Sequence, residues 1–332
     1  MPGRLAPLPP DDWTRDLLAR LGLRERRRRV HTRLGSVVVH LSTLRGGAPG
    51  PEVGLRVYPQ RQQDLGAIET ELGWLEQIAE LGEIAPLPLR DAQGRRWHRL
   101  PDGRIAVLVS WVAGRRLDRS LHPAHLRAAG RLLAGMHQAA DRLGAQGGVR
   151  TDREVDGPDL QAWASDVRPV SSAWPAASQV AAVQAARRIL RETATWPRTP
   201  VSHGLAHGDL HPWNLLYRGT RRDPLAAAID FSDVGIGWRA LDFASVLQYF
   251  CHPLAGFADH RPQYARLYEQ LMLGYTDRRA LWPGVESQIE TMRQARWLNT
   301  AQWVLDVWPH PDRYPFGRPL LADLPERLAS LG

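Results

Sequence analysis

The chain has 332 residues, with 43 basic against 35 acidic side chains, a formal net charge of +8 and an isoelectric point near 10.4. This length is sufficient for two domains or lobes with a large core. The single cysteine, Cys251, excludes an intrachain disulfide and fits a reducing cytoplasm. No run of 18 apolar residues occurs, and residues 1–10 contain no apolar leader segment. We therefore expect a soluble cytoplasmic protein with no membrane partner.

The basic side chains are all arginine, and their densest run is Arg24 with residues 26–29, just before the first predicted strand. Such a run can contact nucleic-acid phosphates. However, the sequence shows no zinc-finger, helix-turn-helix or RNP aromatic pattern. A solvated face near an anionic substrate channel is the favoured interpretation, and nucleic acid is not an expected partner.

The first part of the chain has the pattern of a small sheet with one helix. Two stretches rich in β-branched residues, 37–44 and 53–58, predict strands separated by a Gly- and Pro-rich loop at 45–51. A helix is expected from the N-cap candidate Asp64 to Gly82, because apolar residues recur between them at helical spacing.

An apolar strand at 105–109 leads into the segment 110–114, after which the pattern becomes helical. This change places a boundary between an N-terminal lobe at 1–112 and a C-terminal lobe at 113–332. The helical stripes expected in the second lobe cover residues 126–143, 176–193, 264–273 and 285–307, with a loop at 144–158.

The most informative segment is His-Gly-Asp-Leu-His-Pro-Trp-Asn at 207–214, followed by a second acid at Asp230. An Asp with an Asn five residues later, then an apolar run that ends in another Asp, is typical of kinases. In that arrangement Asp209 accepts the proton of the attacking hydroxyl, while Asn214 and Asp230 hold magnesium against the ATP phosphates. The strands expected on either side of the turn at 218–224 would form a hairpin that presents these oxygen ligands.

The segments HGDLHPWN at 207–214 and IDFSDVGIGWRALDFA at 229–244 resemble the catalytic loop and metal-binding segment of the aminoglycoside phosphotransferase and choline kinase superfamily. The resemblance implies an α+β, bilobal protein-kinase-like fold, with a small N-terminal antiparallel-sheet lobe that binds nucleotide and a larger helical C-terminal lobe. It also implies ATP and Mg²⁺ as cofactors. His207 would support the loop, and Asp242 would brace it from the next helix.

In kinases a strand lysine reaches the phosphates and pairs with a helix glutamate. This chain has no lysine, so the resemblance gives that role to Arg56, with Glu71 as its partner. The residues alone leave open that Arg56 is a surface arginine and Glu71 a solvated helix acid. The resemblance assigns further nucleotide contacts to a degenerate glycine-rich loop and to the inter-lobe linker, namely Gly35, Ser36, Ser110 and Val112.

We predict transfer of the ATP γ-phosphate to a hydroxyl of a small molecule, which could be an amino alcohol, amino acid, sugar or antibiotic. Residues 229–237 are similar to the branch that contains homoserine kinases and stress-response kinases. Substrate contacts are expected from Asp233 by its position after Asp230, and less strongly from Tyr249, Trp297, Asn299, Trp303 and Asp306. The sequence carries no signal for the oligomeric state.

Two other functions are weighed against this one. A Ser/Thr protein kinase of the stress-response type is disfavoured, because a helix near Arg239 follows Asp230 within ten residues and leaves no room for an activation segment. A metal-dependent hydrolase could use His203, His207 and His211, whose spacing on a helix is typical of metal ligands. Gly and Pro residues interrupt that segment, however, which argues against a continuous helix.

Overall fold

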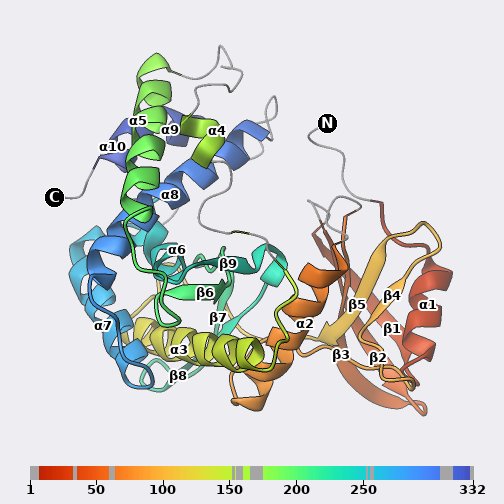
Figure 1. Cartoon of the computed structure of the whole chain (residues 1–332). Coiled ribbons are helices and arrows are strands. Elements are labelled where there is room, and N and C mark those ends of the chain that lie inside the picture. Colours follow the sequence, from red (N-terminus) through yellow and green to blue (C-terminus); the bar gives the residue numbers. More distant parts are fainter. Residues whose placement is uncertain are drawn as a thin grey trace. The chain divides into compact units, whose positions relative to one another are not determined.

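The computed structural model describes residues 7–32, 36–59, 64–151, 154, 160–164, 175–251, 253–254, 258–306 and 317–329. The chain divides into two compact units. The first unit contains residues 3–113 and 147–150, and the second contains residues 114–146 and 151–332. Sheet and helices are both present, so the predicted α+β class is confirmed (Figure 1).

The first unit is built on a five-stranded antiparallel sheet with the strand order β1-β2-β3-β5-β4. Its strands are β1 (Arg24–Thr32), β2 (Val37–Arg45), β3 (Ala48–Val57), β4 (Trp97–Arg99) and β5 (Ile105–Ser110). Alternate residues of β2 are buried, as expected for a sheet with one face on the core. Helix α1 (Asp11–Ala19) covers that core through Leu17 and Leu18.

Two predictions in this unit need correction. The loop expected at 45–51 is shorter, because β3 begins at Ala48 and only Gly46 and Gly47 adopt positive φ in the turn. The early part of β3 contains prolines, and it pairs with β2 alone, since β5 joins β3 only from Val53 onward. Strand proline is tolerated there because no second ladder needs the missing N–H.

The arginine run does not precede the first strand but forms it, as β1 at the edge of the sheet. Its arginine side chains point largely into solvent, and Arg28 pairs with Glu25 and Asp11. Charged side chains on an edge strand oppose pairing with other chains. The sequence did not reveal β1 as a strand, because a strand whose side chains are solvated lacks the alternation of apolar and polar residues that usually indicates one.

Helix α2 (Leu65–Glu80) lies between β3 and β4 in the chain and begins and ends as predicted. The Asp64 carboxylate accepts the N–H of Gly66 at 2.8 Å, which caps the helix, and Gly82 leaves it with a φ of 78°. Glu71 lies on its buried face.

The second unit is mainly helical, with two small two-stranded sheets. Its helices are α3 (Pro123–Ala145), α4 (Leu160–Ala164), α5 (Ala176–Thr193), α6 (Ala240–Cys251), α7 (Tyr264–Thr276), α8 (Val285–Asp306), α9 (Gly317–Ala322) and α10 (Leu324–Leu328). Its strands are β6 (His203–Ala206), which pairs with β9 (Gly235–Trp238), and β7 (Leu215–Gly219), which pairs with β8 (Pro224–Ala228).

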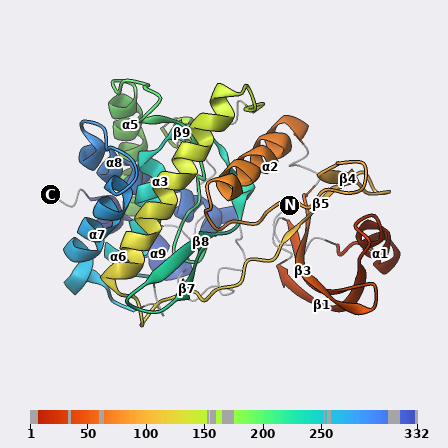
Figure 2. The same ribbon diagram turned by 90° about the horizontal axis from the view of Figure 1, so that it is seen from below.

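The predicted hairpin is confirmed as β7 and β8, with Leu215 opposite Ala228. Figure 2 shows α3 running beside this hairpin, in agreement with its contacts to β8. Helices α6 and α8 pack against each other and supply the residues that hold the loop between β6 and β7. Within the described residues, no helix is long and apolar enough to cross a membrane.

Candidate active site

The loop at 207–214 joins β6 to β7 and is anchored by one buried carboxylate. Asp242, near the start of α6, accepts the N–H of His207 through Oδ2 and the N–H of Gly208 through Oδ1, each at 3.0 Å. Asp242 is fully buried, and Gly208 turns the chain with a φ of 78°. The loop conformation is therefore imposed by an acid outside it.

His137 on α3 completes this support. Its Nε2 lies 3.3 Å from Oδ2 of Asp242, and its Nδ1 lies 3.0 Å from the hydroxyl of Tyr275. Burial opposes the charge of Asp242, but the hydrogen bond from His137 keeps the pKa of Asp242 below its usual range. Burial lowers the pKa of His137 to about 4. His137 is thus a neutral donor to an ionised acid.

His207 links the loop to the strand that carries the second acid. Its Nδ1 accepts the N–H of Asp209 at 3.3 Å, and its Nε2 donates to the carbonyl of Ile229 at 3.2 Å. The ring also lies against Phe231, with centroids 4.6 Å apart. The imidazole of His207 therefore connects the loop segment that contains Asp209 to the segment that contains Asp230.

Asp209 lies at the centre of the site. Arg296 on α8 places Nη2 2.5 Å from Oδ1 of Asp209, while Asn214 Nδ2 and His211 Nε2 lie 3.4 Å and 3.5 Å from Oδ2. Burial raises the pKa of Asp209, but the charges of His211 and Arg296 outweigh it and hold this pKa below its usual range. The carboxylate is therefore ionised and able to accept a hydrogen bond from a hydroxyl.

The sequence interpretation missed Arg296. The sequence gives only an indirect signal: Met292, Ala295 and Trp297 surround this position on the predicted helix, and a charged side chain buried among apolar residues must find a partner. That signal does not identify the partner, which lies 87 residues away.

Asp230 has an unusual backbone. Its φ of 64° and ψ of 69° lie in the left-handed region, and among the described residues it alone is a non-glycine with positive φ. Such a conformation costs about 1–2 kcal/mol for most residues, and Asp tolerates it better than most. The side chain is exposed, and Ser232 Oγ donates to its Oδ1 at 2.8 Å. Strain stored at an exposed acid favours a functional role for its carboxylate.

Asn214 and Asp230 have the donor chemistry that magnesium prefers. Asn214 Nδ2 donates to the carbonyl of Asp209 at 2.9 Å, which leaves the amide oxygen of Asn214 for another partner. Its backbone carbonyl accepts the N–H of Ile229, the residue before Asp230. Magnesium is usually held by one or two protein oxygens together with substrate phosphates. This pair fits that requirement, and no cluster of three or more His, Cys, Asp or Glu side chains suited to a metal occurs among the residues described.

In the first unit, Arg56 on β3 and Glu71 on α2 form a buried ion pair. Arg56 Nη1 donates to Glu71 Oε1 at 2.7 Å, and the Arg56 guanidinium also lies 4.5 Å from the ring centroid of Tyr58. Two neighbouring acids on the same helix, Glu69 and Glu76, pair with Arg96 instead. The structure therefore brings together the two residues that the resemblance paired.

The other predicted nucleotide contacts are distributed unevenly. Gly35 lies outside the described residues, and Ser36 is half-buried just before β2. Ser110 bonds to Leu87 through both its N–H and its Oγ, at 2.8 Å and 2.9 Å. Val112 follows β5, and no acceptor for its N–H is found among the described residues.

The predicted substrate residues differ in position. Tyr249 lies beside the loop, with its ring centroid 5.3 Å from that of Trp213. Trp297 is buried beneath the guanidinium of Arg327 and supports Tyr249 from within the core. The remaining candidates are Asp233, half-buried in the 3₁₀ turn 231–233, Asn299 and Trp303 on α8, and Asp306, whose side chain lies outside the described part.

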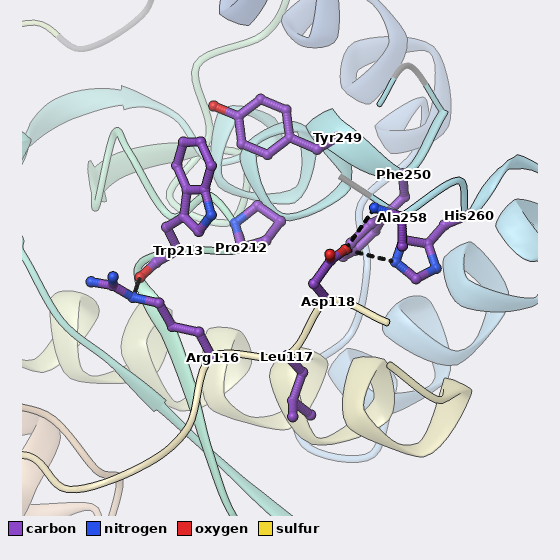
Figure 3. Close-up of a pocket in the computed structure, with 9 residues that line it drawn as sticks. All are labelled: Arg116, Leu117, Asp118, Pro212, Trp213, Tyr249, Phe250, Ala258 and His260. Atoms are coloured by element: carbon purple, nitrogen blue, oxygen red, sulfur yellow. Dashed lines mark hydrogen bonds and ion pairs between the residues drawn. The ribbon is translucent and has the colours of Figure 1, made fainter. Parts of the chain in front are cut away.

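A cavity of about 160 Å³ opens next to the loop (Figure 3). Trp213, Tyr249 and Phe250 supply aromatic walls, and Asp118 and His260 supply polar ones. Asp118 Oδ1 accepts the N–H of Ala258 at 3.0 Å, and the Asp118 side chain is 38% exposed.

The three histidines of the hydrolase alternative do not share a helix. His203 lies in β6 with its ring edge-on to Trp238. The two ring nitrogens of His207 bond to the N–H of Asp209 and to the carbonyl of Ile229. His211 accepts the N–H of Trp213 through Nδ1 at 3.2 Å. The arrangement expected of three helical metal ligands is absent from this described segment, since glycine and proline break it as the sequence indicated.

The phosphotransferase enzyme family matches residues 32–286. The homoserine kinase of Methylobacterium sp. (strain 4-46) is 32% identical over 206 residues, which cover 61% of this chain and 59% of the relative. That of Sinorhizobium medicae (strain WSM419) is 32% identical over 188 residues, which cover 54% and 51%. The chain thus spans between one half and three fifths of the length of these curated relatives.

Two solved structures share the fold. The amicoumacin kinase hAmiN, in complex with AMP-PNP, Ca²⁺ and Ami, superposes with a TM-score of 0.76 at 16% identity, covering 96% of this chain and 93% of that one. The microcompartment-associated aminopropanol kinase superposes with a TM-score of 0.68 at 22% identity, covering 92% and 89%. The predicted kinase-like fold is confirmed.

Proposed function

Since the chain belongs to the phosphotransferase enzyme family, we propose that it transfers the γ-phosphate of ATP to the hydroxyl of a small molecule. The observation that carries this proposal is the position of the Asp209 carboxylate, whose Oδ1 lies 2.5 Å from Arg296 Nη2 in a loop that also contains Asn214. Phosphoryl transfer needs mainly positioning and charge neutralisation, and this loop supplies a fixed acceptor for a hydroxyl proton.

Each proposed role follows from a contact. Asp209 Oδ2 would orient the acceptor hydroxyl and receive its proton, because Oδ1 is occupied by Arg296. Asn214 and Asp230 would hold Mg²⁺, which when bound neutralises negative charge on the phosphate oxygens. Arg56, oriented by Glu71, would bind ATP phosphates through its guanidinium. His207 and Asp242 would position the loop without touching substrate.

A compact acceptor with an ammonium group fits the cavity best. Aromatic faces and a carboxylate attract cations, and here Trp213, Tyr249 and Asp118 provide both. Arg116 Nε donates to the carbonyl of Trp213 at 2.8 Å, and Figure 3 shows its guanidinium turned away from Asp118. The volume of about 160 Å³ lies below the roughly 300–1,000 Å³ of sites for drug-sized ligands. An amino alcohol or hydroxy amino acid is therefore favoured over a multi-ring antibiotic.

Three of the four proteins compared support the same choice by their names, two homoserine kinases and an aminopropanol kinase, whereas the amicoumacin kinase is named for a different acceptor. A protein substrate is disfavoured, because β9 begins at Gly235 and α6 at Ala240, soon after Asp230. That short connection provides no platform for a peptide.

A panel of acceptors tests the proposal. With saturating Mg²⁺ and ATP, we would follow ³¹P NMR for phosphorylation of 3-aminopropan-1-ol, propane-1,3-diol, L-homoserine, kanamycin and a serine peptide. The kcat/KM for 3-aminopropan-1-ol and for L-homoserine should exceed that for propane-1,3-diol by about 10- to 100-fold, because their ammonium groups make cation–π and charge-assisted contacts. Asp118→Asn should remove that preference. The control is Asp277→Asn at the C-terminal end of α7, where Asp277 pairs with Arg127, and this variant should keep the preference. ATP binding without any phosphorylated product would contradict the function.

A further inference from the structure

Arg296 is a buried cation whose charge is directed at the loop of Asp209. The residue is 6% exposed on α8. Its Nη2 lies 2.5 Å from Oδ1 of Asp209, and its Nη1 donates to the carbonyl of Gly208 at 2.9 Å. The planar guanidinium therefore binds a side chain and a backbone group of two consecutive residues, which a point charge could not do with the same geometry.

The guanidinium of Arg296 is itself fixed by Gln248, through a hydrogen bond from Nε. Arg296 Nε donates to Gln248 Oε1 at 3.3 Å, and Gln248 Nε2 donates to Thr300 Oγ1 at 2.7 Å. Thr300 Oγ1 in turn donates to the carbonyl of Arg296 at 2.9 Å. Because Gln248 belongs to α6 and Thr300 to α8, two packed helices fix the direction in which Arg296 points.

In this arrangement the two carboxylate oxygens of Asp209 have different hydrogen-bond partners. Oδ1 is taken by Arg296 at 2.5 Å, whereas the nearest donors to Oδ2, Asn214 Nδ2 and His211 Nε2, lie at 3.4 Å and 3.5 Å. The side chain of Asp209 is 24% exposed, against 7% for Arg296. We therefore assign the ligand to Oδ2, the more weakly bonded oxygen of this partly exposed side chain.

On the basis of the proposed function, we propose that Arg296 is a positioning residue for phosphoryl transfer. It fixes the carboxylate of Asp209 and the carbonyl of Gly208, so that Oδ2 faces the acceptor hydroxyl. It touches neither the acceptor nor ATP. Misplacement of a reacting group by about 1 Å can lower a rate by roughly 100-fold, so loss of this hold should affect turnover far more than binding.

The first test replaces Arg296→Gln. We expect kcat for phosphorylation of the best acceptor in the panel to fall by about 10- to 100-fold, while KM for ATP and for that acceptor changes by less than about threefold. The control is Arg293→Gln, one turn earlier on α8, since Arg293 is buried to a similar degree (5% exposed) and pairs with Glu290 at 2.7 Å. Equal losses in both variants would show a general packing effect and overturn the proposal.

The second test asks whether Arg296 acts through Asp209. In the Asp209→Asn background, Arg296→Gln should lower the remaining kcat by less than about threefold, because residues that act as one unit are not additive. Arg296→Lys should recover part of kcat, since it restores the charge but not the two-point contact. A full, multiplicative loss in the double variant would mean that Arg296 acts elsewhere.

Two further measurements keep the test decisive. If Arg296→Gln does not fold, Gln248→Leu loosens the guanidinium and should lower kcat with KM unchanged. If no acceptor is phosphorylated, the proposed function fails, and ¹⁵N NMR of the Arg296 guanidinium still tests the hold without turnover. Slow rotation of its Nη groups in the parent and fast rotation in Asp209→Ala would support the hold. Fast rotation in the parent would overturn it.

Discussion

Two arginine–carboxylate pairs, one in each unit, have similar geometry but different surroundings. Arg56 and Glu71 are joined at 2.7 Å with side chains 10% and 7% exposed. Arg296 and Asp209 are joined at 2.5 Å, but the acid is 24% exposed. In the first pair both charges are buried, so the loss of either removes a buried ion pair and should lower stability. In the second, water reaches the acid, so its replacement should alter chemistry more than stability.

The largest expected effect comes from the second pair. Asp209→Asn keeps the shape of the side chain and an oxygen for Arg296, but it removes the group that receives the hydroxyl proton. Turnover should fall by roughly 10²- to 10⁴-fold, the usual contribution of general acid–base catalysis. ATP affinity, measured by calorimetry, and the unfolding midpoint should stay close to those of the parent. Turnover near the parent value would remove Asp209 from the mechanism.

A comparison with Asp230 sharpens this point, because backbone conformation rather than a cation positions its carboxylate. Asp230→Ala should abolish magnesium-dependent turnover more completely than Asn214→Ala, since it removes a charged ligand and not a neutral one. Asp230→Gly should be equally inactive but more stable than Asp230→Ala by about 1 kcal/mol, because glycine adopts a φ of 64° without strain. Magnesium titrations that match the parent would refute the ligand assignment.

Breaking the first pair should mix binding and stability effects. Arg56→Ala should weaken binding of ATP and ADP but not adenosine, and it should lower the free energy of unfolding, because the buried carboxylate of Glu71 loses its ion pair at 2.7 Å. Arg56→Lys should restore part of both. Arg104→Ala is the control, since Arg104 is also buried and pairs with Asp102 at 2.7 Å. This variant should lower stability without changing the relative affinities for ATP, ADP and adenosine. Equal losses for all three ligands would assign Arg56 a structural role only.

The two pairs also differ in how far sequence could predict them. Arg56 and Glu71 lie 15 residues apart on adjacent elements with clear periodicity, so the resemblance placed both. Arg296 and Asp209 are separated by 87 residues, and their contact depends on how α8 packs against α6. Local pattern carries no information about such packing.

The same reason explains other results. The motif at 207–214 and the β7–β8 hairpin were predictable, because their turn residues and apolar runs are local. The short β6–β9 pair was missed, since β6 and β9 have four residues each and their pairing joins segments about 30 residues apart. The cavity beside Trp213 was also missed, because Asp118, Tyr249 and His260 come from three separate segments.

Asp242 extends the comparison to an acid held by a neutral partner, His137. The pKa of His137 falls from 6.5 to about 4 on folding, so the unfolded chain binds a proton more readily between these values. The stabilisation is therefore complete above about pH 6.5 and is lost as pH falls toward 4, by on the order of 3 kcal/mol. Asp242, whose pKa is lowered, loses its own contribution only at still lower pH.

Denaturant unfolding between pH 4.5 and 7 checks this assignment. The parent should lose stability as pH falls, and His137→Gln should lose the steep part of that slope, because glutamine can bond to Asp242 without titrating in this range. His203→Gln should retain most of the slope, since His203 is only half-buried in β6. If the dependence of stability on pH is unchanged in His137→Gln, another group must titrate in this range. Asp242 would then not depend on a neutral His137 to brace the loop of Asp209.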